Sequence, residues 1–289
     1  MLELSTPITA IAGIGPKYKK KLENLDILTV EDLLYHFPFR YDDFSQIKKV
    51  RDLQEGEQTT AKGLLGNVKN IYTRNGKRLT KATVTDETGT LELIWFNSHF
   101  LSRVLKANKK YSFSGKIGSF SNMLTMIAPT FELEGESSLD TGRLVPIYPE
   151  TSGVSSKWLR SKIYHTLRGK IEPEEFLPEE ILKTERLPKL KAALWQFHFP
   201  DSPTEAEKAK KRFQLEELFL ELLNVERRKQ SWQKNANAYL IINKKYDNEL
   251  VQLIENLPFN LTDSQKSAIK EIKQDLDKKT AMNRLLEGD

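Results

Sequence analysis

The sequence predicts an α+β protein of several domains, and three observations lead to that fold class. Residues 58–135 contain five short runs rich in β-branched and aromatic residues, which is a composition typical of strands. On both sides of this region, apolar residues recur at the three- and four-residue spacing of amphipathic helices. A length of 289 residues corresponds to two domains of roughly 100–200 residues each, with part of a third.

The composition narrows the class of protein. The chain has no cysteine, which excludes disulfides, thiolate metal sites and a cysteine nucleophile. The four histidines match no metal-ligand spacing, so we expect no metal site. No apolar run approaches the ~18–20 residues of a membrane span, and the N-terminus lacks the basic segment of a signal peptide. We therefore expect a cytoplasmic protein that does not enter a membrane.

Positive charge is concentrated in the β-rich region. The net charge of the chain is +5, but residues 62–116 hold eleven Lys and Arg against three acidic residues. A basic domain on an otherwise mildly acidic chain is typical of proteins that bind polyanions. From the charge alone, a solvated surface without a ligand explains the pattern equally well.

Residues 1–50 are predicted to be a helical region that resembles half of a helix-hairpin-helix. Gly13 and Gly15 form a turn before a lysine-rich helix, and Thr29 caps a second helix that Pro38 ends. In helix-hairpin-helix proteins such glycines let backbone amides approach a phosphate. A tight turn followed by a solvated run of lysines accounts for the same residues, so both interpretations stay open.

Residues 51–135 are predicted to form a five-stranded OB-fold barrel. Three turn signals separate the runs, namely Asn75-Gly76, Glu87-Thr88-Gly89 and Ser121-Asn122, and a helical stretch, SHFLSRVLKAN, lies between the third and fourth runs. Five strands with a helix at this place follow the order of the OB-fold, a small barrel that binds oligonucleotides. A generic sandwich or an unrelated small barrel remains an alternative.

The rest of the chain is predicted to be helical, with one short strand at its end. Residues 136–203 read as a linker with short helices broken by prolines. Residues 204–257 read as a long helix and a connector. A capping box from Thr204 to Glu207 begins the helix, and its apolar residues are expected to form a packing core. In residues 258–289, a capped helix precedes a short buried strand that contains Leu285 and Leu286.

The stretch LIWFNSHF supplies the candidate nucleic-acid contacts. Strand alternation places Leu91, Leu93 and Trp95 in the barrel core and Phe96 on the other, partly polar face. A helical turn that began at Phe96 would bring Phe100 onto the same side. Exposed rings beside Lys and Arg can stack on bases, at about 1–3 kcal/mol per base. The alternative is that both rings close the open end of a small barrel.

No catalytic motif is found in the sequence. G-x-S-x-G, H-E-x-x-H, an acidic dyad and the phosphate-binding loop G-x-x-x-x-G-K-[ST] are all absent. Thr262 and Gln265 match a capping box, which is a sufficient explanation of both. Motor proteins of helicase superfamily 2 use such a glutamine to read adenine, and their next strand leads into the phosphate-binding loop. Here the chain ends at the corresponding point, Gly288-Asp289, so we expect no catalytic residue in this chain.

Together, these segments resemble the RecG family of ATP-dependent DNA helicases, which remodel stalled replication forks and branch-migrate Holliday junctions. The matching segments, in chain order, are GIGPKYKKKLENLDILTVEDLLYHFPFRYDD, TDETGTLELIWFN, LVPIYP, RFQLEELF and LPFNLTDSQKSAIKEI…MNRLLEGD. The resemblance extends over nearly the whole chain. It implies an OB-fold wedge domain, a linker with a long helix, and the first edge of a RecA-like α/β motor lobe that is truncated before its Walker A loop.

The resemblance also implies roles for individual residues. Phe96 matches the aromatic residue thought to stack on the base at the branch point, and Phe100 matches a second, supporting aromatic residue. Gln265, with Phe259 as a neighbour, corresponds to the adenine-reading residue if a motor follows. Contacts to backbone phosphates are expected by charge, rather than by a matched motif, from Lys69, Arg74, Lys77, Arg78 and Lys81.

The expected function is therefore the branched-DNA-binding portion of a RecG-like helicase that acts in DNA repair and recombination. ATP and Mg²⁺ would be cofactors of the full-length parent, and this chain alone would bind neither. Branched DNA is the expected partner, a single-stranded-DNA-binding protein is a second candidate, and the chain is expected to be a monomer. Two alternatives stay open: a general single-stranded DNA or RNA-binding OB-fold protein without a motor, and an adaptor whose barrel binds a peptide tail.

Overall fold

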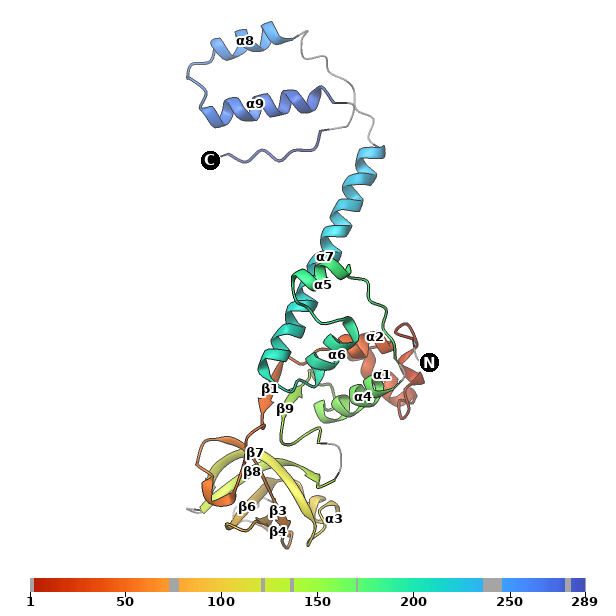
Figure 1. Cartoon of the computed structure of the whole chain (residues 1–289), viewed down its shortest axis with the longest axis vertical. Helices are drawn as coiled ribbons and strands as arrows, with labels where there is room; N and C mark the ends of the chain where they lie inside the picture. The colour runs from red at the N-terminus through yellow and green to blue at the C-terminus, as the bar shows by residue number, and fades with distance from the viewer. Residues whose placement is uncertain are drawn as a thin grey trace. The chain divides into compact units, whose positions relative to one another are not determined.

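The computed structural model of the chain divides into two units, Met1–Gln214 and Leu215–Asp289. The first unit contains a mainly β region and a mainly helical region (Figure 1). The structure describes residues 3–72, 78–120, 123–135, 138–169, 171–235, 246–278 and 282–288.

Short helical elements open the first unit: η1 Ile8–Ala10, α1 Pro16–Leu22, η2 Glu23–Leu25 and α2 Val30–Tyr35. The predicted cap at Thr29 is confirmed, because Asp32 N donates to Thr29 Oγ1 at 3.1 Å and Thr29 N donates to Asp32 Oδ2 at 2.8 Å. After Tyr35 the structure differs from the helical prediction. Two short strands follow, β1 Arg40–Asp43 and β2 Ile47–Lys48, and the 3-10 helix η3 Val50–Asp52 comes next.

Three further helices complete the helical region: α4 Ser156–Arg168, α5 Glu179–Thr184 and α6 Leu190–His198. α4 is capped by Ser155, whose Oγ accepts from Trp158 N at 3.3 Å, and it ends at Gly169, as predicted. The apolar faces of α1, α2, α4 and α6 share one core, to which each helix contributes fully buried leucine, isoleucine, valine or alanine side chains. Burial of these faces holds the short helices in place, since helices of this length are marginal alone.

A buried histidine lies inside this helical core. Tyr148 Oη lies 2.9 Å from His198 Nδ1, and His198 Nε2 lies 2.8 Å from the carbonyl oxygen of Leu34. A carbonyl can only accept, so Nε2 carries the proton and Nδ1 accepts from the tyrosine hydroxyl. Burial lowers the pKa of His198 to about 4, and the ring is therefore neutral at pH 7.

The β region contains six strands where five runs were predicted. They are β3 Gln58–Leu65, β4 Lys69–Tyr72, β5 Arg78–Thr85, β6 Thr90–Phe96, β7 Lys110–Phe120 and β8 Met123–Leu133. The first predicted run divides into β3 and β4 at Gly66. There the chain passes so close to β5 that a Cβ atom on Gly66 would lie 2.3 Å from Thr83 Oγ1. Of the predicted turns, Asn75-Gly76 and Ser121-Asn122 lie at positions outside the described residues, whereas Glu87-Thr88-Gly89 is a turn held by the Asp86 carboxylate.

The strands form one sheet in the order β2-β3-β7-β8-β6-β5-β4, and a short pairing of Leu64 and Leu65 with Thr85 and Val84 also joins β3 to β5. β6 and β8 are parallel, whereas the pairs of β7 with β3 and β8 are antiparallel. The inner face carries an apolar core in which Leu65, Leu93, Phe113 and Met126 are fully buried. The predicted helical stretch shrinks to α3 Leu101–Val104, because Asn97 has a left-handed φ of +54° ahead of it and Leu105, its C-cap, is already extended.

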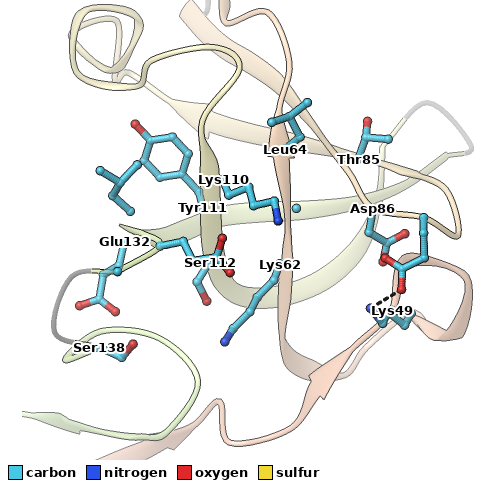
Figure 2. Close-up of a pocket in the computed structure, with 15 residues that line it drawn as sticks. Lys49, Lys62, Leu64, Thr85, Asp86, Lys110, Tyr111, Ser112, Glu132 and Ser138 are labelled. Atoms are coloured by element: carbon cyan, nitrogen blue, oxygen red, sulfur yellow. Dashed lines mark ion pairs between the residues drawn. The ribbon is translucent and has the colours of Figure 1, made fainter.

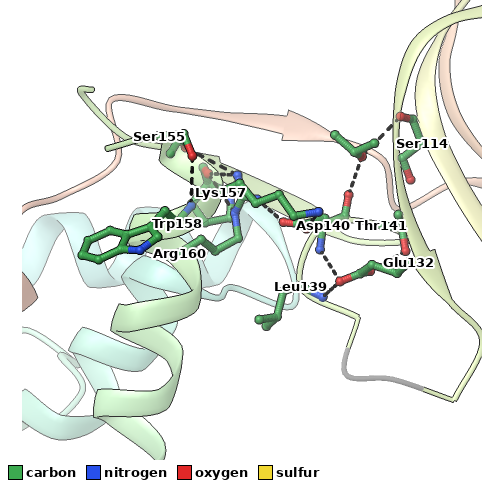
Figure 3. A network of polar contacts seen from close by, with 12 residues as sticks. Ser114, Glu132, Leu139, Asp140, Thr141, Ser155, Lys157, Trp158 and Arg160 are labelled. Carbon is green, nitrogen blue, oxygen red and sulfur yellow. Dashed lines mark hydrogen bonds and ion pairs between the residues drawn. The ribbon is translucent and has the colours of Figure 1, made fainter. Parts of the chain in front are cut away.

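A polar junction connects the β region to the helices (Figure 3). The segment predicted as a linker contains a further strand, β9 Leu144–Ile147, which pairs antiparallel with β1. Ahead of β9, the Glu132 carboxylate of β8 accepts hydrogen bonds from Leu139 N at 2.7 Å, Asp140 N at 3.0 Å and Thr141 Oγ1 at 2.7 Å. Asp140 then forms ion pairs with Lys157 and Arg160 of α4. Strand pairing and ion pairs thus fix α4 against the β region.

The long helix α7 Pro203–Asn235 begins two residues earlier than the predicted capping box implies. Its cap is Ser202 rather than Thr204. Ser202 Oγ accepts from Glu205 N at 3.3 Å, and the Glu205 carboxylate accepts from Asp201 N at 3.1 Å. Pro203 occupies the first helical position, where a missing N–H leaves no hydrogen bond unmade.

The second unit holds the later turns of α7, then α8 Asp247–Glu255 and α9 Asp263–Leu276. The packing core predicted for the long helix does not extend into this unit, because Leu218, Leu222 and Val225 are all more than half exposed. Helical periodicity shows that a helix has apolar positions but not that another element covers them.

The predicted strand at the end of the chain is wrong. Residues 282–288 form no strand, and Leu285 and Leu286 are 84% and 73% exposed. The backbone groups of a strand need a neighbouring strand as partner. The described residues of this unit offer none, so the RecA-like lobe remains a prediction.

Candidate nucleic-acid interface

Phe96 is the last residue of β6, at the edge of the β region. Along this strand Leu91, Leu93 and Trp95 are buried, and Trp95 Nε1 donates to Pro129 O at 2.8 Å. Phe96 is 47% exposed. Ile94, which shares the face of Phe96, is also buried, so Phe96 is exposed because it lies at the end of the strand, immediately after the anchored Trp95.

Phe100 is 54% exposed in the loop before α3, but its relation to Phe96 differs from the prediction. No helical turn begins at Phe96, because Asn97 has a φ of +54° and α3 starts only at Leu101. Among the described residues, the two rings make no ring–ring contact. Phe96 and Phe100 are thus two separate exposed rings on one short segment.

Hydrogen bonds hold this segment against β4 and β5. Thr80 Oγ1 of β5 lies 2.8 Å from Asn70 Oδ1 and 3.1 Å from the carbonyl oxygen of Ser98. The Asn70 amide donates to the carbonyl oxygen of His99 at 3.3 Å and to Ser102 Oγ at 3.1 Å. A backbone hydrogen bond, in which Asn97 N donates to Arg78 O at 3.1 Å, adds to these contacts. The two phenylalanines therefore project from a fixed loop rather than from a free one.

The basic residues predicted as phosphate contacts have different environments. Lys69 and Lys81 face each other on β4 and β5, and Lys81 forms an ion pair with Glu92 at 2.8 Å. The Lys81 ammonium also lies 4.8 Å from the centre of the Phe120 ring, so its charge is already engaged within the protein. Lys69 is exposed. Arg74 and Lys77 lie outside the described residues.

Arg78 brings in an aromatic residue that the sequence analysis missed. Its guanidinium lies 5.6 Å from the centre of the Tyr72 ring, which is 70% exposed. The two residues are cross-strand partners in β4 and β5. In the next pair of this register, Ile71 of β4 is the partner of Leu79 of β5, and Leu79 is also the partner of Phe96 of β6. The sequence did not identify Tyr72, since a two-residue turn at Asn75-Gly76 would make Thr73 the cross-strand partner of Arg78.

The C-terminal candidates belong to the second unit. Gln265 Oε1 accepts from Thr262 N at 2.9 Å, and Gln265 N donates to Thr262 Oγ1 at 3.3 Å, so the predicted capping box is confirmed. Phe259 is exposed. The structural role of Gln265 as a helix cap is thus visible.

A pocket of about 470 Å³ lies on the outer side of β3 and β7 (Figure 2). Lys62, Ser112 and Glu132 form one row across its strands. An ion pair of Lys49 with Glu87 lies at its rim. Its lining mixes charges of both signs, with Lys49, Lys62 and Lys110 against Asp86, Glu87, Glu132 and Glu134. Such a mixture gives no preference for a chain of phosphates, and we place no nucleic acid there.

Two further kinds of site were sought in the part of the chain that the structure describes. No group of three His, Cys, Asp or Glu side chains there could hold a metal ion. None of the described helices combines the length and the apolar character that crossing a membrane requires.

Comparisons with known proteins all point to the same family. Residues 7–169 match the family model described as the RecG wedge domain. The ATP-dependent DNA helicase RecG of Thermotoga maritima is 35% identical over 292 residues, covering 100% of this chain and 37% of the relative. That of Synechocystis sp. is 31% identical over 306 residues, covering 100% of this chain and 36% of the relative.

A solved structure is similar over the same extent. The structure of RecG bound to a three-way DNA junction superposes with a TM-score of 0.74 at 33% sequence identity, covering 100% of this chain and 40% of that chain. This chain therefore spans well under half the length of the relatives that it matches.

Proposed function

Because this chain belongs to the RecG wedge domain family, we propose that it is the branched-DNA-binding part of an ATP-dependent DNA helicase of repair and recombination. The observation that carries the proposal is the family match over residues 7–169, which includes the exposed Phe96 and the loop that fixes it. The solved RecG relative is bound to a three-way DNA junction and aligns with the whole of this chain. The proposed ligands are accordingly replication forks and Holliday junctions.

In this proposal the strands β3, β5, β6, β7 and β8 are an OB-fold, and residues 51–135 are the wedge domain. Support comes from the pairing of β3 with β7 and β5, of β8 with β7 and β6, and of β6 with β5. α3 lies between β6 and β7, where the OB-fold has its helix. The remaining proposed domains are the helical region 1–50, the linker 136–203, the long helix and connector 204–257, and the start of a motor lobe at 258–289.

The wedge would act by stacking on the base at the branch point. Phe96 presents its ring at the end of an anchored strand, and stacking on an unpaired base contributes about 1–3 kcal/mol. A duplex without a junction keeps its bases stacked on each other, so the free energy of stacking on Phe96 is gained only at a branch. Phe100 would act as a second, supporting aromatic residue, and the exposed Lys69 and Arg78, with Arg74 and Lys77, would contact phosphates. Lys81 would contribute less, because Glu92 already neutralises it.

ATP hydrolysis and Mg²⁺ belong in this proposal to the whole protein. The relatives are named ATP-dependent DNA helicases. Gln265, with Phe259 as its neighbour, is the proposed adenine contact there. A single-stranded-DNA-binding protein is a second proposed partner, and the chain is proposed to be a monomer.

Fluorescence anisotropy with a three-way junction, a linear duplex and a single strand of equal length tests the proposal. We expect the junction to bind most tightly and all binding to weaken as salt rises. Phe96→Ala should lower junction affinity about tenfold, which corresponds to one stacked base, and should leave duplex affinity nearly unchanged. Phe176→Ala is the matched control, because Phe176 is also an exposed phenylalanine of the first unit but lies outside the β region.

The outcomes separate the proposal from its alternatives. Equal losses of junction and duplex affinity in Phe96→Ala would refute the stacking role. Equal wild-type affinity for junctions and single strands would favour a general single-strand-binding protein. An absence of salt-sensitive binding to any nucleic acid would favour a peptide-binding adaptor.

A further inference from the structure

A cleft lined by more lysines than carboxylates lies between the β region and α4. Its volume is about 600 Å³. We call it the α4 cleft. Three lysines, Lys106, Lys109 and Lys157, and two carboxylates, Glu132 and Asp140, are among its lining residues. Neither Phe96 nor Phe100 lines it, so any ligand of the cleft would contact a second surface of the first unit.

Two lysines project from a tightly held turn on one wall. Asn108 N donates to the carbonyl oxygen of Leu65 at 2.9 Å, and Leu65 N donates to that of Lys109 at 2.9 Å. Lys106 N donates to Tyr111 Oη at 3.2 Å. Lys106 and Lys109 are both exposed, and neither has an ion-pair partner among the described residues. The backbone beneath these two charges is thus fixed, whereas their ammonium groups are available.

Lys157 supplies a third charge from the opposite wall. Its Nζ lies 2.7 Å from Asp140 Oδ2 and 5.5 Å from the centre of the Phe131 ring (Figure 3). The same Asp140 carboxylate also pairs with the buried Arg160. One negative charge therefore serves two cations, and positive charge remains on this wall. The other nearby carboxylate, that of Glu132, is occupied by hydrogen bonds from residues 139–141.

We propose that the α4 cleft binds the sugar-phosphate backbone of a double-stranded DNA arm. Three lysines on two fixed elements suit a ligand with regularly spaced negative charges, and such contacts position a duplex without reading its sequence. A single strand would be held mainly by stacking on exposed rings. Two rings line this cleft, and neither is free to stack on a base: Tyr111 is buried, and Phe131 is half-buried beneath the Lys157 ammonium. This inference rests on the proposed function in that DNA is the ligand, but it concerns a different surface from Phe96.

The test is the affinity of the full chain for a linear duplex as a function of salt. The double variant Lys106→Gln/Lys109→Gln should bind roughly tenfold more weakly per lysine at 0.1 M salt, because each neutralised phosphate releases about 0.9 counterions. The slope of log K against log salt should fall by about two. The control, Lys208→Gln/Lys210→Gln, makes the same charge change at two exposed lysines of α7 that do not line the cleft, and it should leave both quantities nearly unchanged.

Circular dichroism and thermal unfolding establish that each variant is folded, which is expected because all four lysines are exposed. An unchanged duplex affinity in the cleft variant would overturn the inference while leaving the proposed function intact, provided that the wild type still prefers the junction. Loss of binding to poly-L-glutamate with no loss of duplex binding would overturn it in favour of an acidic peptide. If the wild type shows no preference for the junction over the duplex, that result would instead refute the proposed function.

Discussion

Replacing Asp140 by Asn removes one charge from the buried ion pair that joins α4 to the β region. Asp140 is 5% exposed and Arg160 is 3% exposed. The guanidinium also donates to the carbonyl oxygen of Pro146, from Nη2 at 2.7 Å and from Nε at 3.3 Å. These bonds hold Arg160 in place after the substitution, so its positive charge stays buried without a carboxylate.

The expected cost follows from that uncompensated charge. Removing one partner of a buried ion pair destabilises a protein by about 3–5 kcal/mol. The bonds of Arg160 to Pro146, and the ability of Asn to accept one hydrogen bond, place the expected value near the lower end, at about 3 kcal/mol. Lys157 adds little, at most about 1 kcal/mol, because its side chain is 59% exposed.

Urea unfolding at pH 7.5, followed by tryptophan fluorescence and far-UV circular dichroism, measures this cost. Asp52→Asn is the control, since its carboxylate is 57% exposed and pairs with exposed Arg51, and it should change the free energy of unfolding by less than about 0.5 kcal/mol. Adding Arg160→Met to Asp140→Asn should cost less than the sum of the two single changes, because the stranded charge is removed. A cost below about 1 kcal/mol for Asp140→Asn, or strict additivity, would refute this account of the junction.

Two further predictions concern His198 and Asn70. The pKa of His198 is lowered from 6.5 to about 4 in the folded state, so the unfolded chain binds the proton first, and stability is lost as pH falls from about 6.5 towards 4. Between pH 7 and pH 5 the free energy of unfolding should fall by about 2 kcal/mol. His198→Gln should abolish that part of the pH dependence in urea titrations. An unchanged pH profile in this variant would contradict the neutral ring. Asn70→Ala removes hydrogen bonds that hold the loop of Phe96, so the preference for the junction should fall severalfold while duplex affinity stays within twofold. An unchanged junction preference in the anisotropy assay would show that the loop is held without Asn70.

Several features could be predicted from the sequence because short-range chemistry determines them. The caps at Thr29, Ser155 and Thr262 depend on hydrogen bonds within three residues, and the structure has all three. The alternation along β6 predicted that Leu91, Leu93 and Trp95 are buried, since successive side chains of a strand point to opposite faces. It did not predict that Ile94, on the face of Phe96, is buried as well.

Other features could not be predicted because they depend on partners far along the chain. The division of the first β run reflects the approach of Gly66 to Thr83, and the short extent of α3 reflects the bonds between its following turn and Leu65. The strand expected at Leu285 failed for the same reason, because the described residues contain no partner for its backbone groups.

For this protein, the sequence by itself determined the local structure, the basic character of the β region and the aromatic segment at the end of β6. The tertiary structure alone decided how charge and aromatic rings are distributed in space. It engaged Lys81 with Glu92, brought Tyr72 beside Arg78, and placed Lys157 across a cleft from Lys106 and Lys109. The physical reason is that caps and strand alternation arise from neighbours in sequence, whereas ion pairs, burial and clefts arise from strand pairing and helix packing between distant segments.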